Sequence, residues 1–154
     1  MARDVTFELD LADTFPSLVT KKGVDPEAES LIADLLREEI LSYVATSTSP
    51  VSGHGKFPGL SSSYRERKTQ EGLPGDPNLE FSGDMLDALE VYPVRGGKIR
   101  VEISGKEGEK ADGHNNHSGE SDLPLRRFIP AKGETFKRDI LSKVREILEE
   151  YNGD

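Results

Sequence analysis

The sequence predicts an α+β fold, in which helices pack on one face of a small antiparallel sheet. Residues 5–11 alternate apolar and polar side chains, as in a half-buried strand. Residues 26–46 and 134–151 each carry an apolar stripe at helical spacing. Two further strands are expected within residues 89–104, joined by a turn that contains Gly96 and Gly97. Because the helices and strands do not alternate regularly, the expected sheet is antiparallel and not parallel.

The helix expected over residues 26–46 has the most complete signals. Asp25 suits the N-cap position, and Pro26 suits the first helical position, where a backbone N–H is not needed. Glu27 and Glu29 place negative charge in the first turn, where it favours the helix dipole. The apolar stripe consists of Ala28, Leu31, Ile32, Leu35, Leu36, Ile40, Tyr43 and Val44.

Two shorter apolar patterns complete the expected elements. A short capped helix is expected just after Ser82, with apolar residues three or four positions apart as far as Leu89. The last helix is expected over residues 134–151. Its stripe consists of Phe136, Ile140, Val144, Ile147, Leu148 and Tyr151.

Two long stretches contain few apolar residues. Residues 47–78 are rich in Ser, Gly and Pro, and we expect an extended arm or loop there. Residues 105–122 form a second polar loop. With 154 residues the chain fits a single domain, 1–154, whose loops become ordered when they meet a partner.

The composition excludes several classes of protein. The net charge of −9 argues against general nucleic-acid binding, because neutralising phosphates requires a basic surface. Cysteine is absent, which excludes disulfides and thiolate chemistry. No secretory signal is apparent, and no apolar run approaches the roughly 20 residues of a membrane span. We therefore expect a soluble protein that is made in the cytosol.

Asp112, His114 and His117 lie within six residues of the sequence. Such residues can form a hydrolytic metal site. The surrounding stretch offers neither a rigid element nor oriented partners for the histidines, so a solvated polar loop is the preferred interpretation. No metal or other cofactor is therefore expected, although a small metal-dependent hydrolase that uses these three residues is kept as an alternative.

No catalytic group is predicted. Paired carboxylates, such as Asp84 with Asp87, fall on helix faces that are expected to be solvated. His54 lies among glycines but lacks the spacing of a phosphate-binding loop. We therefore do not expect an enzyme.

The basic residues gather in two places in this acidic chain. Arg65, Arg67 and Lys68 form one group, and Arg126 with Arg127 forms the other. In an acidic protein that assembles with its own copies, such groups can meet an acidic face on a neighbour.

Four segments in this order resemble the tail-completion, or virion morphogenesis, proteins, which act at the neck of tailed bacteriophages. The first is the helix "SLIADLLREEILSYVATSTSP", which leads into "GKFPGLSSSYRERK". The second and third are "LEFSGDMLDALEV" and "KADGHNNHSG", and the fourth is "LPLRRFIP" before the final helix. The resemblance covers residues 30–151. In the third segment Lys110 replaces the family's aromatic residue, and either His114 or His117 corresponds to the family's histidine.

The resemblance implies a structural role in the virion and not an enzymatic one. The expected subunit forms a ring, as a hexamer or dodecamer, at the head–tail junction, where it contacts connector, terminator or tail tube proteins. It is expected to be made in the host cytoplasm, to need no membrane, and to meet genomic DNA only as passing cargo. Some of its Asp and Glu side chains would then line the bore, where they would not retain phosphates. A tail terminator or connector adaptor of the same neck and a monomeric peptide-binding module are the alternatives.

The resemblance also suggests how residues 126–129 work. Pro124 and Pro130 disfavour helix on either side, so this stretch is expected to run extended along the sheet. Phe128 would then point into the core, while Arg127 and Ile129 would point away from it. The expected contacts with a neighbouring subunit involve Arg65, Arg67, Lys68, His114, His117, Arg126, Arg127 and Phe128.

Overall fold

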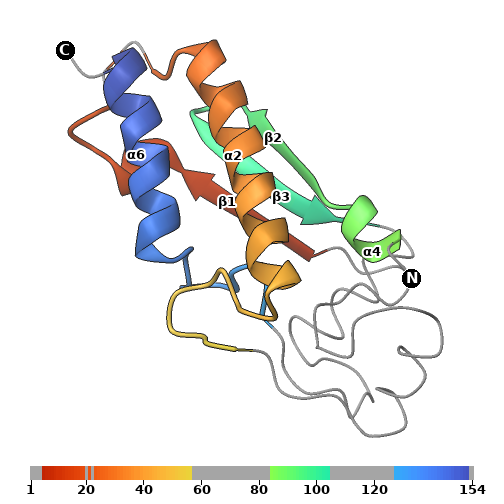
Figure 1. Cartoon of the computed structure of the whole chain (residues 1–154). Helices are drawn as coiled ribbons and strands as arrows, with labels where there is room; N and C mark the ends of the chain where they lie inside the picture. Colours follow the sequence, from red (N-terminus) through yellow and green to blue (C-terminus); the bar gives the residue numbers. More distant parts are fainter. Residues whose placement is uncertain (1–4, 20, 22, 57–83, 105–126, 153–154) are drawn as a thin grey trace, which may run out of the picture.

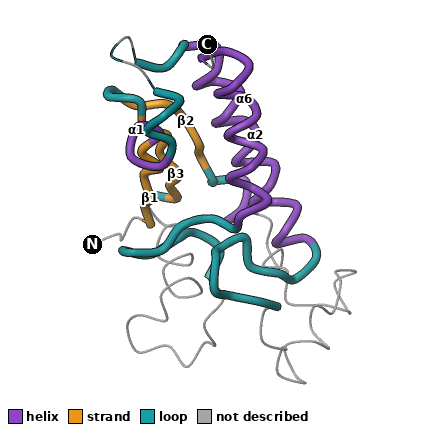
Figure 2. Tube along the Cα trace, turned by 90° about the vertical axis from the view of Figure 1, so that its left-hand side faces the viewer, coloured by secondary structure: helices purple, strands orange, loops and turns teal. Residues whose placement is uncertain are grey.

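A computed structural model describes residues 5–19, 21, 23–56, 84–104 and 127–152. The fold is α+β with two layers, as expected. Three antiparallel strands, β1 (Val5–Asp10), β2 (Glu90–Val94) and β3 (Lys98–Ile103), form one layer in the order β1-β3-β2. Two long helices, α2 (Pro26–Ala45) and α6 (Arg138–Asn152), lie side by side and cover one face of the sheet (Figures 1 and 2).

The register of the sheet separates a core face from a polar face. Val5 pairs with Ile103, and Leu9 pairs with Ile99, so buried side chains of β1 and β3 meet on the face toward the helices. On the other face, Arg100 donates to Glu8 through Nε and Nη2, at 2.9 and 2.7 Å. The alternation expected for residues 5–11 is therefore confirmed over β1.

The hairpin between β2 and β3 is also confirmed. Gly96 and Gly97 have φ angles of 91° and 73°, a region that L side chains rarely adopt, and this explains the glycine pair at the turn. Pro93 lies in β2, which is an edge strand, the position in a sheet where proline is tolerated.

The first strand ends one residue earlier than expected. The Asp10 side chain accepts a hydrogen bond from the Asp13 N–H, 3.1 Å away, and so caps the short helix α1 (Leu11–Thr14). Leu11 therefore belongs to a helix and not to the strand. It is nevertheless fully buried, and its N–H donates to the Gly97 carbonyl at 3.0 Å.

Helix α2 begins and ends almost as predicted. The Asp25 carboxylate caps the Glu27 N–H at 2.8 Å, and the helix ends at Ala45, before Ser47 turns the chain with a φ of 57°. The expected apolar stripe is buried with the exception of Leu31, which is 40% exposed, and of Leu35 and Tyr43, which are partly buried.

The start of the last helix was predicted wrongly. Helix α6 begins at Arg138 and not near residue 134, so Phe136 lies before the helix instead of on its stripe. Phe136 forms a β-bridge with Val51, and its ring meets that of Phe7 edge-on at 5.4 Å. These contacts with the loop after α2 and with β1 hold Phe136 outside the helix.

Polar side chains connect the two long helices. The Tyr43 hydroxyl of α2 donates to the Asp139 carboxylate in the first turn of α6, and this hydrogen bond, with burial, raises the pKa of Tyr43 to about 12. Nearer the middle of α6, Lys143 pairs with Glu39.

The remaining expectations fall partly outside the described residues. The short helix α4 (Asp84–Asp87) is present, whereas Ser82 lies outside. Residues 47–56 form a loop that packs on the fold, while the rest of the arm expected over 47–78 and the whole polar loop 105–122 lie outside. One buried cluster spans both layers, and the single domain 1–154 stays a prediction for the whole chain.

None of the described helices combines the length and the apolar character that a bilayer crossing requires.

Two substitutions in α2 test the packing of the layers. Ile40 is fully buried, so Ile40→Ala should lower the free energy of unfolding by about 2–5 kcal/mol, measured by urea denaturation. Leu31→Ala is the matched control on the exposed side of the helix. This substitution should change the free energy of unfolding by about 0.5 kcal/mol or less. Equal losses for the two variants would contradict the burial described here.

Candidate functional site

Two loops that are distant in sequence are joined at the end of the fold where α2 finishes and α6 begins (Figure 1). The loop after α2, residues 46–56, and the loop before α6, residues 127–137, are together called the junction here. The Ser52 N–H donates to the Thr135 carbonyl at 2.9 Å, and the Lys137 N–H donates to the Pro50 carbonyl at 2.8 Å. These bonds flank the bridge between Val51 and Phe136 and make one small paired unit from the two loops.

Ser49 is at the centre of the junction. It is 1% exposed and is the only buried polar residue in the described part of the chain. Its hydroxyl donates to the Arg127 carbonyl and accepts a hydrogen bond from the Val51 N–H at 3.1 Å. One side chain therefore satisfies backbone groups of both loops, which would otherwise be costly to bury.

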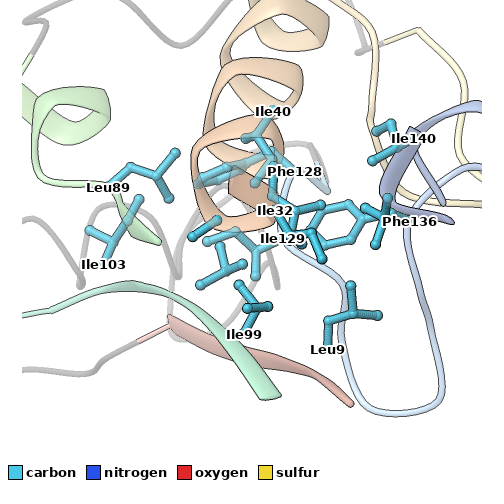
Figure 3. Close-up of a cluster of buried hydrophobic side chains, with 14 of the residues drawn as sticks. Leu9, Ile32, Ile40, Leu89, Ile99, Ile103, Phe128, Ile129, Phe136 and Ile140 are labelled. Atoms are coloured by element: carbon cyan, nitrogen blue, oxygen red, sulfur yellow. The ribbon is translucent and has the colours of Figure 1, made fainter. Parts of the chain in front are cut away.

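Phe128 and Ile129 fill the core next to Ser49. Both side chains are fully buried, and Figure 3 shows them among apolar side chains of α2 and of the sheet, such as Ile32 and Ile99. The loop before α6 thus supplies part of the hydrophobic core as well as half of the junction. Burying two such side chains contributes roughly 1.5–3 kcal/mol each.

Glu134 carries the charged part of the junction. Its carboxylate lies 2.8 Å from Nε2 of His54 and accepts a hydrogen bond from the Ala131 N–H at 3.0 Å. The Arg127 Nε atom lies 3.0 Å from the same carboxylate and forms an ion pair with it. Burial by itself would raise the pKa of Glu134, but the hydrogen bonds from His54 and Ala131 and the Arg127 charge outweigh it, so the pKa is lowered.

The hydrogen bonds and the ion pair of these groups hold the two loops together. A carboxylate beside an imidazole can orient a general base, but the Ser49 hydroxyl is already bonded to the Arg127 carbonyl. In the residues that the structure describes, no group of three or more His, Asp or Glu side chains could hold a metal ion. The alternative metal ligands Asp112, His114 and His117 lie outside those residues.

The structure corrects part of the expected contact surface. The burial predicted for Phe128 is confirmed, and a fully buried Phe128 cannot also make the expected contact with a neighbouring subunit. Ile129 is buried as well and does not point away from the core. The prediction for Arg127 was also wrong, because its side chain is only 14% exposed and pairs with Glu134 of the same chain. Residues 127–130 do not form a strand, so period-2 alternation does not apply to them. Arg65, Arg67, Lys68, His114, His117 and Arg126 lie outside the described residues.

Sequence reasoning missed three members of the junction. Ser49 and His54 lie in a stretch without apolar periodicity, and Glu134 was assigned to the start of the last helix. About 80 residues separate His54 from Glu134. The turn at Lys132 and Gly133, where Gly133 has a φ of 85°, is the one local signal that this loop folds back.

Comparison with known proteins adds no relative of this chain. No family model, no curated protein sequence and no solved structure matches it.

Glu134→Gln tests the charged part of the junction. The substitution keeps the size of the side chain but removes its charge, so it should lower the free energy of unfolding by about 1–3 kcal/mol at pH 7. Because the folded state lowers the pKa of Glu134, this contribution is present above the ordinary value of 4.5 and is lost as the pH falls through the lowered pKa. The difference between the two proteins should therefore shrink in acid.

The matched control is Glu149→Gln, which removes an exposed Glu that pairs with Arg145 one helical turn away. It should change the free energy of unfolding by less than about 0.5 kcal/mol at either pH. Urea titrations at pH 7 and pH 3 make both comparisons. A loss for Glu134→Gln that is no larger than the control's at pH 7 would contradict the role given to Glu134.

Proposed function

We propose that this chain is a non-enzymatic structural protein of a tailed-bacteriophage particle, a neck or tail-completion subunit that forms a ring and mediates head–tail joining. The four segments that resemble this family span residues 30–151 in the family's order. The two-layer fold is compatible with this role, since it presents a rigid frame interrupted by long polar segments.

The observation that carries the proposal is the position of residues 127–130, the described part of the "RRFIP" stretch. The resemblance gives this stretch weight as a family motif, and Phe128 and Ile129 in it are buried at the junction. The described elements that flank the two long polar segments lie at this same end of the fold: the loop after α2, α4, the end of β3 and the loop before α6 (Figure 1). We infer that this end faces the neighbouring subunits.

The proposed contacts follow from charge. Arg65, Arg67, Lys68 and Arg126 would pair with carboxylates of a neighbouring copy, for which a chain with a net charge of −9 offers many partners. Arg127 is not part of this set, because it already forms an ion pair with Glu134 of its own chain. His114 and His117 stay in the proposed contact surface. The partners would be further copies in a hexamer or dodecamer and the adjoining connector, terminator or tail tube proteins, with DNA passing through the bore.

Deleting the gene from the phage that carries it tests the proposal. The expected result is DNA-filled heads and separate tails in electron micrographs, with joined particles restored by a plasmid copy. Particles that are joined and infectious without the protein would refute the proposal. In wild-type particles, the α2–sheet–α6 frame should fit density at the head–tail junction.

Charge reversal in the complementing copy tests the contact surface. Arg65→Glu with Arg67→Glu should reduce the yield of joined particles at least about tenfold, because like charges would face each other across the interface. Lys21→Glu with Arg145→Glu is the matched control, with the same change of charge at two exposed positions, and should leave the yield within about twofold. Equal yields from the two double variants would rule out this use of the basic group.

A further inference from the structure

Helix α2 presents apolar and acidic side chains together on its outward side. Leu31, Asp34, Leu35 and Glu38 follow one another three or four positions apart, so they are neighbours on the helix surface. These four residues are called the outer patch here. In the described part of the chain, Leu31 is the only large hydrophobic side chain that is exposed, at 40%. Asp34 and Glu38 are exposed beside it, and Leu35 is half-buried against the core.

The charge of the outer patch is negative. Arg37 is the only cation in the sequence of α2, and its Nε donates to the Leu89 carbonyl, 3.2 Å away. Lys143, on the adjacent helix α6, pairs with Glu39. These two cations of the helical layer are therefore bound to groups outside the outer patch. A partner that meets the outer patch gains most if it brings positive charge together with an apolar group.

We propose that the outer patch of one copy binds residues 61–70, "SSSYRERKTQ", of a neighbouring copy. Within five residues this segment holds the aromatic ring of Tyr64 and the cations of Arg65, Arg67 and Lys68. It thereby complements an apolar side chain that lies between two carboxylates. A contact between two different surfaces of successive copies is heterologous, and such contacts close into rings. The proposal rests on the proposed function, in which copies lie side by side, and it names the acidic surface that the basic group meets.

The reach of the segment favours a neighbouring copy over the same chain. Lys56 forms a β-bridge with Thr48, so the described chain leaves the fold beside the end of α2. From Ala45, the last residue of α2, Leu31 lies about 21 Å back along the helix. The eight residues from Lys56 to Tyr64 span at most about 26–29 Å. Tyr64 would therefore reach Leu31 of its own chain only with this stretch almost fully extended.

A peptide with the sequence of the segment tests the binding directly. The probe is fluorescein-labelled "SSSYRERKTQ", and its fluorescence polarisation is followed as the full chain is added at low salt. A second peptide carries Arg65→Gln, Arg67→Gln and Lys68→Gln. It should bind about tenfold more weakly, because its charges are lost. Equal binding of the two peptides, or no binding of the first, would overturn the proposal.

Two double variants locate the binding surface. Asp34→Lys with Glu38→Lys should weaken the binding of the basic peptide at least about tenfold, because like charges then meet. Asp13→Lys with Glu90→Lys makes the same change of charge at two exposed positions outside α2 and α6, and should leave the binding within about twofold. Circular dichroism should show an unchanged fold for both. Equal losses from the two double variants would place the peptide elsewhere and overturn the proposal.

Two variants expressed together distinguish a contact between copies from a contact within one chain. Arg65→Glu with Arg67→Glu, and separately Asp34→Lys with Glu38→Lys, should each reduce the yield of joined particles at least about tenfold when supplied alone. Supplied together, they should raise the yield at least about fivefold above either alone, since the segment of each then faces opposite charge on the other. Recovery only in a chain that carries all four substitutions, or no recovery in either case, would overturn the proposal.

The peptide assay does not depend on the phage. Particles that join without the protein would refute the proposed function. The peptide and the double variants would still decide whether the outer patch binds the segment.

Discussion

The structure depends on the closure of one end of its core by two loops that must be ordered together. Phe128 and Ile129 complete the apolar contacts between α2 and the sheet, but they come from a segment without regular secondary structure. Their backbone can be buried only if its polar groups are satisfied, and Ser49 does this for the Arg127 carbonyl. The junction is therefore part of the core, although almost half of it belongs to a stretch that is rich in Ser and Gly.

This closure relates the fold to the proposed role. A subunit in a ring needs a frame that stays rigid while long polar segments adapt to its neighbours. The junction lies at the end of the fold where the two long polar segments join the described elements. Its two loops are held together by backbone hydrogen bonds, by the Ser49 hydroxyl and by the ion pair of Glu134. At the opposite end of the fold, Val19, Val24, Glu29 and Arg95 are among the residues that line an open hollow.

The elements that could be predicted from the sequence are those with local signals. Periodicity and the Asp25 cap predicted α2, and the Gly-Gly turn with its flanking alternation predicted the hairpin. Phe136 was assigned to the last helix because its spacing fits the stripe, but its bridge to Val51 and its ring contact with Phe7, both distant in sequence, hold it outside the helix. Arg127 and Ile129 were misplaced for a similar reason: strand alternation was applied to a loop whose side chains are directed by Ser49 and Glu134. Polar contacts between residues so far apart in the sequence produce no periodic pattern that a single sequence could reveal.

Native-state hydrogen exchange tests most directly whether the junction belongs to the core. The relevant amides are those of Ser52 and Lys137, which pair the two loops, and those of β3 in the middle of the sheet. If the junction folds with the core, the loop amides should exchange with an opening free energy within about 1 kcal/mol of the β3 amides. If they instead exchange several kcal/mol more readily, through local opening while the sheet stays protected, the junction is an ordinary surface contact and the account is contradicted.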